Sequence, residues 1–260
     1  MCAYNCGPYI REAIGSILKQ TISCWELLIC DDSSSDNTWQ TITEYVEKYP
    51  GQIYAVRNNR NRKQGFSRNR CLKRAQGKYV AIMDGDDRCS PERLKKQYDF
   101  LESHPEYAFV GTAMSIFDER GEWGESIPKQ EVLSHDLALD SGFIAASCMF
   151  RKEILNSVGG YNTEQKYYYV EDYDLIQRLY AKGYRGANLP EKLYQYREYR
   201  ETIHRRNMTH RFHGAVLSAR AVKQFHLPKY KYIHTINRVA IGLLPQRIYL
   251  FLHHLRRTAK

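Results

Sequence analysis

Acidic residues gather at two points in the first third of this sequence, and their spacing suits a metal ion. Asp84-Gly85-Asp86-Asp87 and Asp31-Asp32-Ser33-Ser34-Ser35-Asp36 each follow a short apolar run. Carboxylates crowded together repel one another unless a cation joins them. Carboxylate oxygens are the ligands that Mg²⁺ prefers, and a bound ion can in turn hold a diphosphate. Local chemistry leaves two interpretations of Asp84, Asp86 and Asp87 open, a metal site or caps for the following helix. For Asp36 we expect the cap.

The pattern around these clusters predicts strands that alternate with helices. Strands are expected at 26–30, 52–57, 79–83 and 109–113, and helices at 9–18, 36–49, 66–75 and from 91. This alternation predicts an α/β fold, a mostly parallel sheet flanked by helices. In such sheets ligands bind beyond the carboxyl ends of the strands, where both acidic clusters would lie.

The pattern is looser over residues 114–150, where only a turn at 118–121 stands out. Helical periodicity returns at 151–158 and after Glu171. Glu171 and Asp172 themselves could be no more than acids that favour a helix N-terminus. Asp174 is expected to be a solvated helix residue.

The net charge of +10 is concentrated at the C-terminal end. Residues 202–260 hold 12 Lys or Arg and no Asp or Glu, whereas residues 1–201 hold 27 bases and 29 acids. A basic segment of this kind favours an anionic partner, either a phospholipid surface, a lipid phosphate or nucleic acid. Nucleic acid is the weaker choice because the acidic clusters would repel its phosphates.

The seven cysteines are scattered and form no CxxC pair, which argues against zinc. Their odd number and the lack of a signal peptide favour a reducing cytoplasm. No apolar run reaches the roughly 18–20 residues that cross a bilayer.

Several blocks of sequence occur in an order that belongs to one known family. They are residues 2–5, 9–14, 16–21, 26–33, 65–72, 75–79 and 84–87, then Gly159-Gly-Tyr-Asn162 and Glu171-Asp172. Over residues 1 to about 197 the chain resembles the family 2 glycosyltransferases of bacterial cell-surface polysaccharide synthesis. These blocks form four motif regions, at 2–33, 65–87, 159–162 and 171–172. A lone DxD motif is weak evidence, but four regions in the family's order are strong evidence.

The resemblance implies a GT-A fold, which is Rossmann-like, and a domain division. Residues 1–201 would be the catalytic domain, with a nucleotide-sugar-binding half at 1–113 and an acceptor half at 114–201. Residues 202–260 would be a basic helical tail. We expect the first strand of the family to be missing, because the chain begins at Met1, where that strand would end.

The resemblance also assigns roles to residues. Ala3, Asp32, Arg68 and Asp84 would bind the nucleotide-sugar, Asp86 would bind Mn²⁺ or Mg²⁺, and Asp172 would be the catalytic base. Asp87, Glu171 and Tyr161 are further candidates. A base opposite the leaving group inverts the anomeric configuration.

The implied activity is transfer of a hexose from a nucleotide-sugar, UDP-linked, to a hydroxyl of a glycan or polyprenyl-diphosphate-linked acceptor. Gln177-Arg-Leu-Tyr180 lacks the tryptophan of the QxxRW pattern of processive synthases, which favours single addition. The histidine that often follows a Tyr-Arg pair is absent after Tyr196-Arg197, and the role of His204 stays open. The alternatives are a non-catalytic scaffold with this fold or a nucleic-acid-binding protein.

The tail is expected to bind an anionic membrane surface. Ile241, Leu244, Ile248, Leu252 and Leu255 fall at helical intervals, with Arg238, Arg247, Arg256 and Arg257 among them. The alternative is that this apolar stripe packs on the catalytic domain. We therefore expect a cytoplasmic protein, peripheral on the inner face of the plasma membrane.

Overall fold

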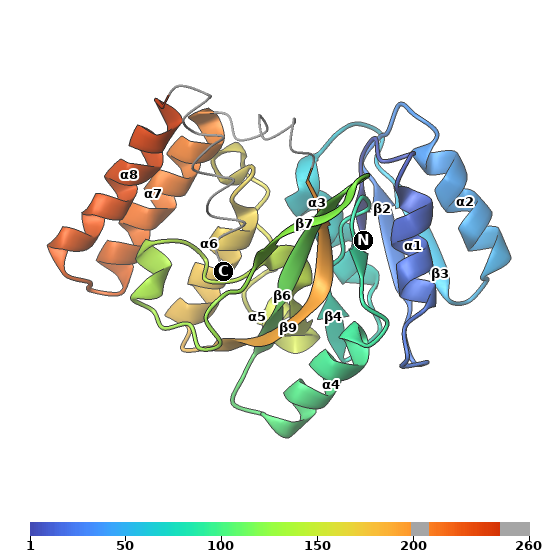
Figure 1. Cartoon of the computed structure of the whole chain (residues 1–260), viewed down its shortest axis with the longest axis horizontal. Coiled ribbons are helices and arrows are strands. Elements are labelled where there is room, and N and C mark those ends of the chain that lie inside the picture. Colours follow the sequence, from blue (N-terminus) through green and yellow to red (C-terminus); the bar gives the residue numbers. More distant parts are fainter. Residues whose placement is uncertain (199–207, 245–260) are drawn as a thin grey trace.

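The computed structural model describes residues 1–198 and 208–244, and its N-terminal part is a parallel sheet. Strands β1 (Cys2–Ala3), β2 (Leu27–Asp31) and β3 (Ile53–Arg57) pair in that order. Helices α1 (Ile10–Leu18) and α2 (Thr38–Lys48) connect them (Figure 1), and α3 (Lys63–Arg74) follows β3. Apolar residues of α1, among them Ile10 and Ile14, are buried in one core with those of β2.

The second sheet is mixed. Its order is β4 (Tyr79–Ala81), β8 (Met149–Arg151), β6 (Phe109–Asp118), β9 (Gly186–Arg197) and β5 (Arg88–Cys89), with β7 (Gly121–Ser126) paired to β6. Only β6 and β9 run parallel in it. Helices α4 (Arg93–Ser103), α5 (Lys152–Ser157) and α6 (Glu171–Ala181) belong to this half of the chain.

The predicted strands and helices of residues 1–113 are all present, with small shifts at their ends. The difference lies beyond residue 113. There β6 continues to Asp118 and turns into β7, so the expected turn at 118–121 is the end of a hairpin. Asp36 accepts the amide of Thr38, the first residue of α2, at 3.0 Å, although the helix cap itself is Asn37.

The two sheets meet at β1. The Cys2 amide donates to the Met83 carbonyl at 3.3 Å, and the Gly85 amide donates to the Cys2 carbonyl at 3.0 Å. On the other side of β1, the Cys30 amide donates to the Met1 carbonyl at 3.0 Å. The expectation that this strand is missing was wrong, because β1 (Cys2–Ala3) pairs with β2 at that position of the sheet. Because β2 lies on one side of β1 and the segment after β4 on the other, this is a topological switch point, where α/β sheets bind ligands.

The described part of residues 202–260 is helical. Helices α7 (Met208–Gln224) and α8 (Ile233–Gly242) lie side by side at the left of Figure 1, and α7 packs on α6. Among the described residues, none of the helices combines the length and the apolar character that crossing a bilayer requires. The stripe residues beyond Leu244 lie outside the described residues, as does His204.

The expectation that Asp174 is solvated was wrong. Its side chain is fully buried between α6 and α7, where it accepts hydrogen bonds from Arg178, Arg220 and Asn162. Arg178 is one helical turn away, but Arg220 comes from a helix far along the chain. Helical periodicity on α6 alone could not reveal that partner.

Candidate active site

Arg68 of α3 connects the Asp84–Asp87 loop to the Glu171-Asp172 pair. Its Nη2 atom donates to Asp84 Oδ1 at 3.1 Å, and its Nη1 atom donates to Asp172 Oδ1. The Arg68 side chain is 5% exposed, whereas those of Asp84 and Asp172 are 18% and 29% exposed. Burial lowers the pKa of the guanidinium, but the two carboxylates outweigh burial and raise this pKa well above its usual value. Arg68 therefore stays charged and holds both acids at one point.

Tyr161 lies against the same guanidinium. The Arg68 guanidinium carbon is 5.3 Å from the centre of the Tyr161 ring, which is a cation–π distance. Asn69, also on α3, fixes the Tyr161 backbone from both sides, since it accepts from the amide and donates to the carbonyl, each at 2.8 Å. Gly160 precedes it with a φ of 68°, and a Cβ there would lie 2.5 Å from Asn69 Oδ1. Glycine is required at this approach.

Within the Asp84–Asp87 loop, Asp87 has a structural position. It is buried, and its carboxylate accepts the Tyr194 hydroxyl at 2.7 Å and the Arg197 amide at 2.8 Å. Burial raises the pKa of Asp87 well above its usual value, and the charges of Asp86 and Asp84 add to the effect. Asp87 thus joins the loop to β9, which leaves Asp84 and Asp86 as the more accessible carboxylates.

Gly85 lies in a turn, but glycine is needed there for a close approach rather than for a positive φ. Its φ is not positive, but a Cβ would lie 2.9 Å from Cys6 Sγ and 3.1 Å from the Cys2 carbonyl oxygen. The loop can therefore lie directly against β1 only because residue 85 has no side chain.

Asp32 is buried and makes several contacts within the protein. Its carboxylate accepts Asn58 Nδ2 at 2.6 Å and the amides of Arg62 and Lys63, each at 2.8 Å. A carboxylate offers about four acceptor positions, so these donors leave Asp32 about one more. Its own amide donates to the carbonyl of Ala3 at 2.8 Å, which brings these two candidates together beside the switch point.

Glu171 and Asp172 begin α6, as the acidic pattern predicted. Glu171 is 5% exposed, and its Oε2 atom has no hydrogen-bond partner within the part of the chain that the structure describes. Burial, and then the charge of Asp172, raise the pKa of Glu171 to about 7. Glu171 is thus buried with one unpaired oxygen, while its neighbour Asp172 contacts Arg68.

The donor set fits a divalent ion that a substrate helps to bind. Within residues 1–198 and 208–244, no three His, Cys, Asp or Glu side chains gather closely enough to form a site of their own. Mg²⁺ is usually held by one or two carboxylates, with substrate phosphates and water completing its shell. Asp86, with Asp84 beside it, matches this kind of site, and the like charges around Asp87 favour a cation there.

Several residues that shape the site were not predicted. Tyr194 and Arg197 of β9 fix the acidic loop, Asn58 contacts Asp32, and Asn69 holds the Tyr161 loop. Each is a polar residue whose partner is distant in sequence or on another element. The one available signal was a polar residue with no assigned role inside a motif, such as Asn69 within 65–72.

This arrangement defines a class. An acidic loop and the carboxylate of Asp172, joined by Arg68 beside the switch point of an α/β sheet, are the features of a GT-A glycosyltransferase. The chain belongs to glycosyl transferase family 2, whose family model matches residues 1–159.

Relatives with known names support this class. The putative glycosyltransferase EpsE of Bacillus subtilis is 36% identical over 95% of this chain and 89% of its own length. An Escherichia coli protein, the UDP-Glc:alpha-D-GlcNAc-diphosphoundecaprenol beta-1,3-glucosyltransferase WfaP, is 29% identical over 72% of this chain and 71% of its own.

Solved structures share the fold. S. aureus TarS in complex with UDP-GlcNAc superposes with a TM-score of 0.67 over 93% of this chain and 70% of its own, at 21% identity. The mannosyltransferase PcManGT from Pyrobaculum calidifontis, in complex with GDP-Man and Mn²⁺, gives 0.68 over 97% and 76%, at 18% identity.

The raised pKa of Glu171 predicts a pH-dependent stability. Because the folded protein holds the Glu171 proton more tightly than the unfolded chain, this stabilisation is complete below about pH 4.5 and is lost as the pH rises through about 7. Relative to Glu171→Gln, the wild-type free energy of unfolding should fall by about 3 kcal/mol from pH 4.5 to pH 8. Urea unfolding at both pH values measures it, with the exposed Glu47→Gln as the control. A constant difference between wild type and Glu171→Gln would show that Glu171 titrates normally.

Proposed function

We propose that this protein is an inverting, non-processive, metal-dependent hexosyltransferase. Its donor is a nucleotide-sugar, UDP-linked, and its acceptor is a hydroxyl of a glycan or a polyprenyl-diphosphate-linked sugar in surface polysaccharide synthesis. The observation that carries the proposal is the double contact of Arg68, which holds Asp84 of the acidic loop and Asp172 at one point. A donor at the switch point then lies between the metal-binding loop and a base.

The donor is held by residues 1–113. Asp32 has one acceptor position left for the nucleoside, with Ala3 next to it, and Arg68 and Asp84 line the sugar and ribose side. The TarS structure with UDP-GlcNAc, which shares the fold, supports UDP as the nucleotide.

Asp86 is the protein ligand of Mn²⁺ or Mg²⁺. The PcManGT structure contains Mn²⁺ with its donor, which supports a divalent ion in this fold. When bound, such an ion stabilises the negative charge that develops on the leaving diphosphate. The Arg197 Nε atom donates to the Asp86 carbonyl at 2.8 Å, so β9 helps to hold the ligand in place.

Asp172 is the general base. Its carboxylate takes the proton of the acceptor hydroxyl while that oxygen bonds to the anomeric carbon and the bond to the diphosphate breaks. Attack from the face opposite the leaving group inverts the configuration. The Asp172 side chain keeps 29% of its surface exposed, so an acceptor can reach it, and the Arg68 contact fixes its position.

The acceptor is bound by residues 114–201, where Tyr161 and Glu171 adjoin the base. The name of WfaP describes transfer of glucose from UDP-Glc to a GlcNAc unit on diphosphoundecaprenol. By likeness to this relative, we assign a lipid-linked acceptor of the same class.

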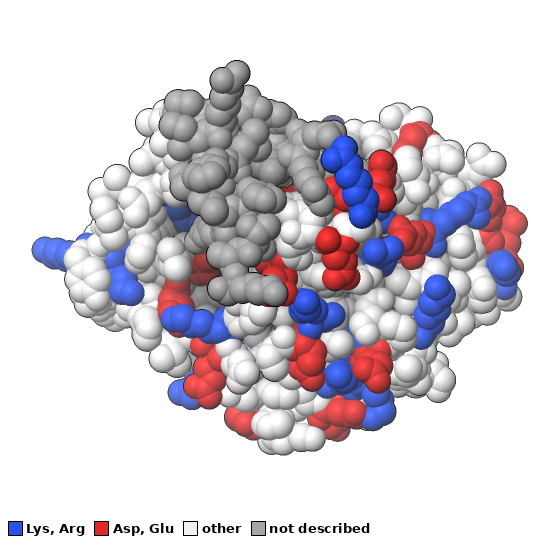
Figure 2. Space-filling model, in the orientation of Figure 1, with Lys and Arg blue, Asp and Glu red and all other residues white. Residues whose placement is uncertain are grey.

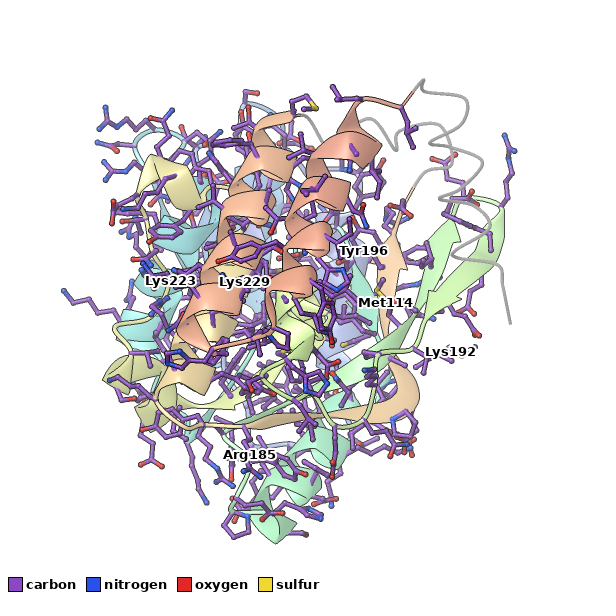
Figure 3. All side chains as sticks on the ribbon, turned by 90° about the vertical axis from the view of Figure 1, so that its left-hand side faces the viewer. Met114, Arg185, Lys192, Tyr196, Lys223 and Lys229 are labelled. Atoms are coloured by element: carbon purple, nitrogen blue, oxygen red, sulfur yellow. The ribbon has the colours of Figure 1, made fainter. Side chains whose placement is uncertain are left out.

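The α7–α8 pair is the part of the described chain best suited to meet an anionic membrane. Its outer side exposes Phe212, Val216, Ile236 and Leu243 by 52–74%. The segment from 202 contains no acid. At the left edge of Figure 2, where these helices lie, blue and white surface is visible without red. Figure 3 faces this pair, with Lys223 and Lys229 near one end of it.

Not every basic residue of the pair serves that surface. Arg238, counted above among the membrane-facing charges, turns inward: it donates to the Leu139 carbonyl at 2.6 Å and lies 5.2 Å from the Tyr173 ring centre. We therefore assign membrane contact to the outer apolar side chains and the exposed lysines, with a peripheral, cytoplasmic location.

Removal of the Asp86 carboxylate should abolish metal-dependent donor binding. Without it the diphosphate loses its bridging cation, so Asp86→Ala should bind UDP equally weakly with Mn²⁺ and with EDTA. Calorimetric titration of UDP measures this, and Asp99→Ala, an exposed aspartate of α4, is the control. If Mn²⁺ still tightens UDP binding in Asp86→Ala as in wild type, the metal assignment is wrong.

Neutralising the base should separate binding from transfer. Asp172→Asn should keep donor affinity and lower the rate of transfer by about 10²–10⁴, the usual contribution of a general base. The assay is UDP release from a panel of nucleotide-sugars with Mn²⁺. A wild-type rate in this variant would reduce Asp172 to a helix-start residue.

Membrane contact should depend on the exposed apolar side chains. We expect Phe212→Ser/Ile236→Ser to bind anionic vesicles at least about tenfold more weakly than wild type, because apolar burial supplies most of the interfacial affinity. Co-sedimentation with anionic and with neutral liposomes measures it. Ile127→Ser, which is 60% exposed beyond β7, is the matched control. Equal binding by all variants, or no wild-type binding to anionic vesicles at low salt, would rule out this surface.

A further inference from the structure

A buried ionic cluster joins α6 to α7 behind the catalytic carboxylate. Asp174 is fully buried, and its Oδ1 atom accepts Arg220 Nη1 at 2.6 Å while its Oδ2 atom accepts Arg178 Nε at 2.7 Å. Asn162 Nδ2 donates to Oδ2 as well, at 2.5 Å. Removing a carboxylate from water is costly, and only a nearly complete set of partners offsets that cost. This cluster is therefore a specific junction rather than a surface ion pair.

Arg220 makes the cluster a junction between two helices. Its Nε atom donates to Gln177 Oε1 at 2.7 Å, and Gln177 Nε2 donates to the Leu217 carbonyl at 2.8 Å. Apolar contacts support the same junction, since Leu217 of α7 is buried with Val170 and Tyr173. Polar contacts through Gln177 and apolar contacts through Leu217 thus both hold α7 against α6, close to the start of α6.

The cluster also contacts the loop that packs on Arg68. Arg178 donates to the carbonyls of Val158 and Gly160, at 2.6 and 2.7 Å, and so holds the loop that carries Tyr161. Tyr161 lies over the guanidinium of Arg68, which also contacts Asp84 and Asp172. The same ionic cluster therefore fixes both the loop above Arg68 and the helix that supplies Asp172.

From this arrangement we propose that Arg220 is a positioning residue for Asp172, so that α7 belongs to the active site although it lies outside residues 1–159. The inference rests on the proposed function of Asp172 as the base. An error of about 1 Å in the position of a catalytic group can cost about 10²-fold in rate, whereas donor binding by residues 1–113 does not involve α7. Arg220 should therefore affect kcat and leave the donor KM unchanged.

The test compares Arg220→Met, Arg220→Lys and Gln224→Met for UDP release with Mn²⁺, using the nucleotide-sugar of the panel that turns over fastest. Arg220→Met keeps the apolar stem and should lower kcat by about 10- to 100-fold at an unchanged donor KM. Arg220→Lys keeps a positive charge beside Asp174 but loses the additional hydrogen bond to Gln177. Its kcat should therefore lie between those of wild type and Arg220→Met. Gln224→Met changes an exposed side chain at the end of the same helix and should have the wild-type rate.

A double-mutant cycle separates positioning from general destabilisation. If Arg220 acts through Asp172, Arg220→Met should have no further effect in the Asp172→Asn background, because coupled sites are not additive. If the two effects on kcat add fully and Asp172→Asn is slow, the positioning role of Arg220 is wrong but Asp172 remains the base. A wild-type rate in Asp172→Asn would overturn both the base and the inference. If Arg220→Met does not fold, the same cycle with Arg220→Lys decides.

Discussion

The site depends on the buried guanidinium of Arg68. Arg68 holds Asp84 and Asp172 close together, although one follows β4 and the other begins α6. Without that charge the two carboxylates would repel each other at a place only partly open to water. The same guanidinium lies against Tyr161. One side chain thereby joins Asp84, Tyr161 and Asp172, which are distant in sequence.

The rest of the structure holds α3, and with it Arg68, in place. Asp32 accepts the amides of Arg62 and Lys63 where α3 begins, at a turn in which Lys63 has a φ of 70°. A Cβ on Gly65 would lie 2.8 Å from the Asn162 carbonyl oxygen, so the loop at 159–162 packs directly on the α3 backbone. The ionic cluster around Asp174 then fixes that loop and α6 together. The site is built from contacts between elements that are distant in sequence.

That origin explains what the sequence could and could not predict. Alternating strands and helices placed the acidic loop of Asp84 and Asp86 at the strand ends, because local periodicity determines where elements begin and end. The family resemblance supplied Arg68, Tyr161 and Asp172, and the structure brings them together, while their roles remain proposals. The burial of Asp174 was missed because its partner Arg220 lies on another helix.

Strand pairing was also beyond the sequence pattern. The hairpin of β6 and β7 and the mixed second sheet follow from which strands meet. One chain's periodicity specifies a strand but not its neighbour. Tyr194, which carries the hydroxyl that holds Asp87, reads in sequence only as another tyrosine among many.

The most direct test of the central claim is the rate of Mn²⁺-dependent UDP release from UDP-glucose and UDP-GlcNAc by wild type and Arg68→Lys. A lysine keeps the charge, but its single ammonium cannot match the two-pronged contact of the guanidinium with Asp84 and Asp172. We expect wild type to release UDP from at least one of these donors, and Arg68→Lys to do so at least about tenfold more slowly, since misplaced catalytic groups lose rate steeply. An Arg68→Lys rate equal to that of wild type, or no UDP release by wild type from either donor, would contradict the account.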